Sequence, residues 1–205
     1  MGISIYYQGT INRIEGVPEL SNELVEFASI LGWEVKQWNG HWNRPNTAVL
    51  EQRTEGYELT GHIPLRGVSL LADPECEPLF LTFNSEGALA STTNMLMADK
   101  SPSEPQKFWL STMTHYTSAD VHIALIKLLK YLKTRFISDL QVYDETGFWD
   151  HEDSSRVINA FNSVNRNNHN RPESLNLIPK RVLYNKTPEQ IADLIENMMR
   201  NRFGR

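Results

Sequence analysis

The chain has 205 residues, of which 40% are hydrophobic and 22% charged, and its formal net charge at pH 7 is -5. This length and composition are typical of a soluble globular protein with a buried core. The acidic balance argues against a dedicated nucleic-acid binder, whose surface is normally basic, and the short apolar runs argue against a membrane protein. Cys76 is the only cysteine, so no intramolecular disulfide forms, which agrees with a cytoplasmic location.

The first part of the chain is predicted to alternate between strand and helix. β-Branched and aromatic residues predict a strand over residues 3–11. Apolar residues at helical spacing then predict a helix that begins near Ser21 and ends before Gly32. A second strand is expected over residues 33–38, followed by a polar loop over residues 39–46.

The middle of the chain predicts strands only. The candidate ranges, which glycine and proline residues separate, are 58–63, 68–71 and 79–83. The turn-forming residues 84–87 predict a hairpin that joins the last of these strands to residues 88–91.

The second half repeats the earlier order of elements. A strand is predicted over residues 108–115, and residues 117–120 have the form of a capping box at the start of a long amphipathic helix. A strand over residues 140–143 follows, and either Asp153 or Ser154 is suited to cap a further helix.

These elements predict an α+β fold. Strand–helix–strand occurs at 3–38 and again at 108–143, which favours a mainly antiparallel sheet with two β-α-β-like halves, helices on one face, and additional C-terminal helices. Residues 1–165 are expected to form one α+β domain. Residues 166–205 are interpreted as an Asn-rich linker and a C-terminal amphipathic helix that docks on the domain or on a partner.

Local signatures of known chemistries are absent from the sequence. We find no GxGxxG, GxxxxGK[ST], HExxH, CxxC or GxSxG sequence. No two of the six histidines have the spacing that directs two imidazoles at one metal ion. The sequence therefore predicts neither a metal site nor a cofactor.

The segment DETGFWDHED, residues 144–153, combines five carboxylates with an imidazole and two aromatic rings. Strand alternation directs Asp144 and Glu145 to opposite faces, so these neighbours cannot form a close acid pair. Asp144 is suited to an Asx-turn and Asp153 to a helix cap, which favours a structural interpretation of the cluster.

Two functional hypotheses remain. The first is a non-enzymatic binding or regulatory protein, for instance an immunity-type inhibitor, in which Asp144, Glu145, Trp149 and Asp150 form an acidic, aromatic surface for a basic protein partner. The alternative is a hydrolase-like enzyme whose site combines His115 with carboxylates of residues 144–153. His115 is expected to face Asp144 across neighbouring strands in either case.

Two stretches carry a resemblance to other proteins. GVSLLADPECEPLFLTFNSEGAL and LLKYLKTRFISDLQVYDETGFWDHED are similar to a group of bacterial cytosolic proteins of uncharacterised function. That group more often reads Asp-Glu-Gly-x-Tyr-Trp-Glu in the second stretch, so Thr146 and Phe148 depart from its pattern. The resemblance implies a soluble bacterial protein and assigns no catalytic residue.

Overall fold

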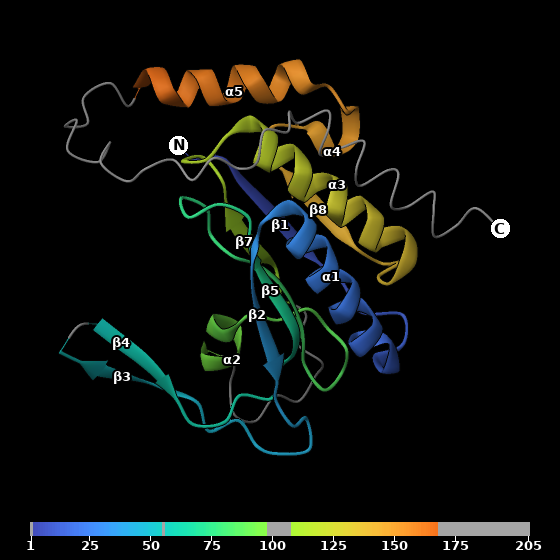
Figure 1. The fold of residues 1–205 in the computed structure, drawn as a ribbon, viewed down its shortest axis with the longest axis vertical. Coiled ribbons are helices and arrows are strands. Elements are labelled where there is room, and N and C mark those ends of the chain that lie inside the picture. Colours follow the sequence, from blue (N-terminus) through green and yellow to red (C-terminus); the bar gives the residue numbers. More distant parts are fainter. Residues whose placement is uncertain (1, 55, 98–107, 168–205) are drawn as a thin grey trace.

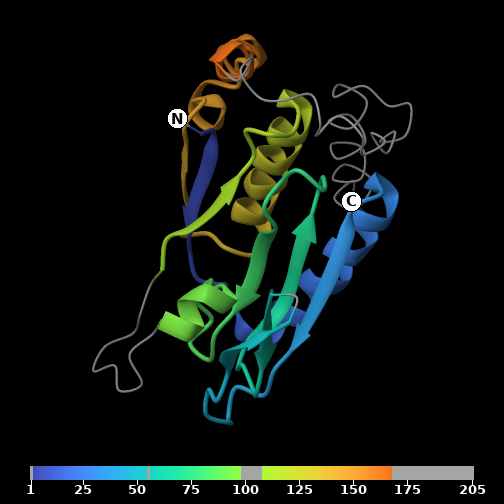
Figure 2. The ribbon, with the colours of Figure 1, turned by 90° about the vertical axis from the view of Figure 1, so that its left-hand side faces the viewer.

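The computed structural model describes residues 2–54, 56–97 and 108–167 (Figure 1). These residues form an α+β fold with open antiparallel sheets, as the sequence predicts. The strands are divided between two three-stranded sheets and a separate two-stranded hairpin, and the two longest helices lie side by side (Figures 1 and 2).

The first sheet has the N-terminal strand at its centre. Its strands, in spatial order, are β7 (Leu110–Met113), β1 (Ser4–Gln8) and β8 (Gln141–Asp144). In this register Tyr6 lies opposite Ser111 on one side and Tyr143 on the other. The central strand therefore pairs only with segments that follow it by more than a hundred residues.

The second sheet consists of β2 (Glu34–Asn39), β5 (Arg66–Leu71) and β6 (Leu79–Phe83), in that spatial order. Tyr7 joins the two sheets, because its buried hydroxyl accepts a hydrogen bond from Phe80 N at 2.8 Å and donates one to Phe80 O at 3.1 Å.

The strand predicted over residues 88–91 is shorter in the structure than the sequence indicated. Ala88 and Leu89 make isolated bridges only, because the chain then turns into α2 (Thr92–Met97), where Ser91 and Asn94 bond each other.

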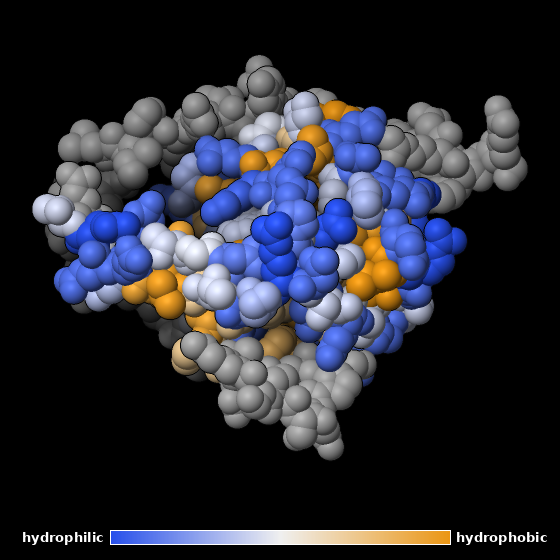
Figure 3. Space-filling model, turned by 90° about the horizontal axis from the view of Figure 1, so that it is seen from below, coloured by the Kyte–Doolittle hydropathy of each residue, from blue (hydrophilic) through white to orange (hydrophobic). Residues whose placement is uncertain are grey.

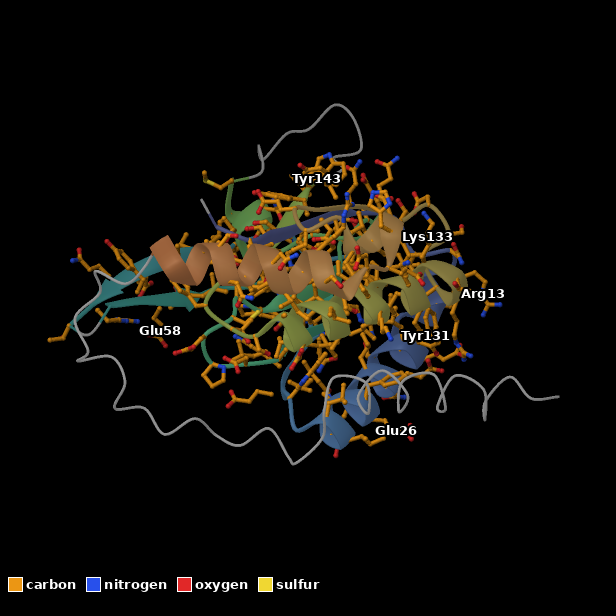
Figure 4. All side chains as sticks on the ribbon, turned by 90° about the horizontal axis from the view of Figure 1, so that it is seen from above. Arg13, Glu26, Glu58, Tyr131, Lys133 and Tyr143 are labelled. Carbon is orange, nitrogen blue, oxygen red and sulfur yellow. The ribbon has the colours of Figure 1, made fainter. Side chains whose placement is uncertain are left out.

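Helices α1 (Val17–Leu31) and α3 (Ala119–Arg135) supply much of the core. The rings of Phe27 and Tyr131 meet edge to face at 5.6 Å, and the Tyr131 hydroxyl donates to the buried carboxylate of Glu23. Helix α1 begins earlier than predicted, since a 3-10 turn (Ile14–Gly16) leads directly into its first turn. Both helices lie on one side of the first sheet, opposite the labelled Tyr143 in Figure 4.

A hairpin of β3 (Val49–Arg53) and β4 (Gly56–Thr60) extends from the body of the molecule (Figure 1). The sequence predicted only a strand at 58–63 here. Almost every residue of the hairpin is exposed, including Tyr57 at 73%. From below, apolar groups emerge in separate areas between hydrophilic residues (Figure 3).

Two further helices follow the first sheet. They are α4 (Phe148–His151) and α5 (Ser154–Asn167), which packs on α3 through the buried Val157 and Phe161. Asp153 Oδ1 accepts a hydrogen bond from Ser155 N at 2.9 Å, which confirms the predicted cap. The predicted C-terminal helix lies outside the described residues. None of the helices in the described ranges combines the length and apolarity needed to cross a membrane.

Gly67 allows β5 to approach β6 closely. Its φ is 132°, and an added Cβ would lie 2.3 Å from Leu81 O. Gly67→Ala should therefore lower the free energy of unfolding by about 2–5 kcal/mol, from backbone strain together with overpacking. The measurement is urea unfolding followed by circular dichroism.

Gly56→Ala is the matched control for this substitution. Gly56 in the hairpin has a similar φ of 122°, but a Cβ added there would have no atom within 4 Å. It should lose only the strain component, about 1–3 kcal/mol. Equal losses in the two variants would contradict a packing role for Gly67.

Candidate functional site

The five residues that the sequence placed in one site lie in different elements and differ in burial. Asp144 is buried at the end of β8, whereas the next residue, Glu145, is exposed. Trp149 and Asp150 lie in α4, with Trp149 half-buried and Asp150 exposed. His115 follows β7, is half-buried, and contacts Tyr116, with ring centroids 3.6 Å apart and ring planes inclined by 53°.

The histidine that bonds Asp144 is His122, not His115. His122 Nε2 lies 2.9 Å from Asp144 Oδ1, and both side chains are fully buried. The expectation that His115 faces Asp144 across neighbouring strands was wrong, because β1 lies between β7 and β8. His122 shares the buried face of α3 with Leu125 and Leu129, so its helical position brings it over the end of β8, while the ring of His115 contacts that of Tyr116.

Two threonines complete the buried polar network. Thr114 Oγ1 lies 2.8 Å from His122 Nδ1, and Thr146 Oγ1 lies 2.9 Å from both Asp144 carboxylate oxygens. Asp144 also accepts hydrogen bonds from the backbone N–H groups of Thr146 and Trp149, at 2.9 and 3.1 Å. The predicted Asx-turn at Asp144 is thereby confirmed. The network connects the end of β7, helix α3, strand β8 and helix α4.

Thr114 can serve either protonation state of His122. When the imidazole is neutral with its proton on Nε2, Nδ1 accepts and the Thr114 hydroxyl donates to it. When the imidazole is charged, Nδ1 donates to Thr114, whose proton then turns to Ile3 O at 3.2 Å. Both ring nitrogens of His122 therefore keep a partner in either state.

The order Thr114, His122, Asp144 has the connectivity of a nucleophile–base–acid triad. A nucleophile must reach a substrate, however, and both Thr114 and His122 have 0% exposure. The hydroxyl is also occupied by partners inside the fold. We therefore interpret this arrangement as a structural tie between elements.

Trp149 is engaged by the protein's own cations. Lys130 Nζ and Lys133 Nζ lie 5.7 and 5.8 Å from the centroid of its ring, and Lys130 also pairs with Glu152. Trp149 packs partly against the core as well. The Trp149 ring therefore packs α4 against α3, and little of its surface is left for a binding site.

An open hollow lies instead on the outer face of the first sheet. Its volume is about 390 Å³, and its lining residues, which define the outer-face hollow, are Tyr6, Trp109, Tyr143 and Glu145. Trp109 is 50% exposed and Tyr143 is 61% exposed, and the rings of Tyr6 and Tyr143 lie 6.0 Å apart. Glu145 is the one residue that this hollow shares with the predicted site.

Sequence reasoning missed the three aromatic residues of the hollow. Each belongs to a segment that was predicted to be a strand, and alternation would have assigned Tyr6 and Tyr143 to the faces opposite Tyr7 and Asp144. What was missing was the spatial order β7-β1-β8, which brings the three segments together. No group of three or more metal-ligating side chains occurs in the described part of the chain.

The environment of Asp144 lowers its pKa from 3.8 to about 2. Burial acts to raise this pKa, but the hydrogen bond and charge of His122 and the N–H groups of Thr146 and Trp149 outweigh it. Because the pKa of Asp144 in the folded protein lies below its ordinary value, the ionised carboxylate stabilises the folded state above about pH 4. This stabilisation is lost as the pH falls toward about 2, and amounts to roughly 2 kcal/mol.

Asp144→Asn tests this coupling. At pH 7 the variant should lose about 2–4 kcal/mol of unfolding free energy, since an amide cannot accept all the hydrogen bonds that the carboxylate accepts. The deficit should shrink between about pH 4 and pH 2, where only the wild-type protein loses carboxylate-dependent stability. Urea unfolding at pH 7, 4 and 2.5 measures both effects.

A deficit that stays constant over this pH range would contradict the assigned role of Asp144. The control is Asp150→Asn, because Asp150 is an exposed acid of the same segment. This substitution should change the free energy of unfolding at pH 7 by less than about 0.5 kcal/mol.

Comparisons with protein-family models, curated proteins and solved structures find no match for this chain. The chemistry of the described side chains is therefore the basis on which a function is proposed. Two arrangements stand out in that chemistry: a buried polar network that fixes the end of β8, and an exposed aromatic hollow with one carboxylate.

Proposed function

We propose that this chain is a non-enzymatic binding or regulatory protein of the cytosol that engages a basic protein partner, as an immunity-type inhibitor would. The observation that carries the proposal is the outer-face hollow, where three aromatic side chains, two of them exposed, gather with Glu145. Tyrosine and tryptophan are enriched at protein interfaces and often dominate their binding energy.

The position of the hollow favours binding to a preformed surface. Tyr6 lies in the central strand of its sheet, and Tyr143 lies directly opposite it in β8. Asp144, the next residue, is anchored in the buried network, so the backbone that carries Tyr143 and Glu145 is held in place. A surface that is already ordered loses little conformational entropy when a partner binds.

The charge of the surface favours a basic protein over a nucleic acid. Glu145 lines the hollow, and the chain carries a net charge of -5. Phosphate groups would be repelled by this charge, whereas lysine and arginine side chains would be attracted.

Hydrolysis is less well supported by the same geometry. A hydrolase would need an accessible base beside its nucleophile. The histidine–carboxylate pair among the described residues, His122 with Asp144, is fully buried and bonded to the fold on every side. The binding hypothesis requires only groups that line an open hollow.

A quantitative affinity experiment tests the proposal. The full chain is immobilised, exposed to lysate of its native organism, and compared with Tyr143→Ala and Glu145→Arg by mass spectrometry. Proteins with basic surfaces should be retained by the wild-type chain, and should decrease by roughly tenfold or more with each variant. Their retention should also weaken as the salt concentration rises.

Two control variants match the chemistry of these substitutions at other exposed positions. Tyr57→Ala removes an exposed tyrosine from the hairpin, and Asp150→Arg reverses an exposed charge in α4. Both should retain the wild-type set of proteins. If all four variants captured the same proteins equally, the outer-face hollow would not be the binding surface.

A further inference from the structure

The aromatic floor of the outer-face hollow is built from neighbouring strands. Tyr6 and Tyr143 are register partners, and their rings are inclined by 40° with centroids 6.0 Å apart. Trp109 directly precedes Leu110, the residue of β7 that pairs with Tyr7 on the other side of β1. The three rings therefore form a tilted surface that a flat group can cover.

Glu145 places a fixed carboxylate beside these rings. Its Oε2 accepts a hydrogen bond from Ser4 N at 2.7 Å, so the position of the side chain is set by the backbone of β1. A carboxylate has two oxygens and about four acceptor sites, and one bond from Ser4 uses only one of them. The remaining capacity is available to a donor that enters the hollow.

The same chain shows how its half-buried tryptophans are used. Lys36 lies 4.2 Å from the ring centroid of Trp38, Arg66 lies 4.9 Å from that of Trp42, and the two lysines described above flank Trp149. Trp33 is buried. Over Trp109, in contrast, no cation comes from the residues that the structure describes.

We propose that the outer-face hollow binds the guanidinium group of an arginine side chain presented by the protein partner. This inference rests on the proposed function and specifies its chemistry. A guanidinium is planar and weakly hydrated, stacks on aromatic rings, and donates hydrogen bonds in a fork that matches a carboxylate. A volume of about 390 Å³ accommodates one such side chain with its aliphatic stem.

Arginine matches the hollow better than other ligands of similar size. A lysine ammonium is a compact, strongly hydrated charge that cannot stack or form a fork. A nucleotide would bring its phosphates toward Glu145. A neutral sugar could cover the aromatic rings, but it would gain nothing from the charge of the carboxylate, and this difference can be measured.

The test is a titration of the full-length protein with three blocked peptides. The probes are acetyl-Gly-Gly-Xaa-Gly-Gly-amide with arginine, lysine or citrulline at the central position, followed by NMR of the tryptophan and tyrosine ring resonances. The arginine peptide should shift the signals of Trp109 and Tyr143. It should bind about 2- to 30-fold more tightly than the citrulline peptide, which has a similar shape but no charge.

Variants separate the contribution of charge from that of the rings. Glu145→Gln retains an oxygen that can accept from Ser4 N, and should reduce the preference for arginine over citrulline to near unity. Tyr143→Ala should weaken binding of the arginine peptide by about 2- to 30-fold. The matched control Tyr57→Ala should leave its affinity unchanged.

Other results would overturn the proposal. Equal affinity for the arginine and citrulline peptides, or tighter binding of the lysine peptide, would remove the guanidinium assignment. So would binding of a neutral disaccharide, such as cellobiose, at the same ring resonances in preference to the arginine peptide. Free L-arginine that bound more tightly than the blocked peptide would indicate a small-molecule site.

The two proposals can fail separately. If no arginine peptide binds but Tyr143→Ala still loses protein partners in the affinity experiment, the guanidinium assignment is wrong and the proposed function stands. If the arginine peptide binds as expected but all variants capture the same proteins, the hollow recognises guanidinium groups, and the proposed function is wrong.

Discussion

The hydrogen bond between His122 and Asp144 is the constraint on which the arrangement of this molecule depends. It joins the first turn of α3 to the last residue of β8, and Thr114 extends it to the end of β7. Both partners are inaccessible to water, so neither could lose the other without leaving a buried polar group unsatisfied. Four elements that follow one another along the chain, β7, α3, β8 and α4, therefore take up their positions together.

The same bond determines which side chains face outward. Successive residues of a strand point to opposite faces, so the inward anchoring of Asp144 requires Tyr143 and Glu145 to point away from the core. A change of one residue in the register of β8 would bury Tyr143 and expose the partner of His122. The buried network and the outer-face hollow are thus two sides of one strand, and the stability of the first preserves the geometry of the second.

The local periodicity of the sequence was sufficient to predict much of the fold, but it could not predict which residues meet in the site. Helix α3 and strand β1 have strong patterns, whereas the hairpin at 49–60 is exposed on both faces and carries no pattern that a core would impose. Helix α4 is four residues long and begins after Gly147, whose φ is 73°. Helix propensities do not predict such a start. Only His115 was expected to face Asp144, and the packing of α3 over β8 brings His122 to that carboxylate instead.

The central position of β1 has a consequence for how the protein is made. Its partners β7 and β8 begin about a hundred residues or more after it ends, so the first sheet cannot form while those segments are still unsynthesised. At ordinary rates of translation this delay is roughly 5–20 seconds. During that interval Tyr6 and its neighbours are exposed as an unpaired apolar strand, which is a hazard for aggregation. The segments of β7 and β8 complete the outer-face hollow, and their pairing with β1 also ends this exposure of the nascent chain.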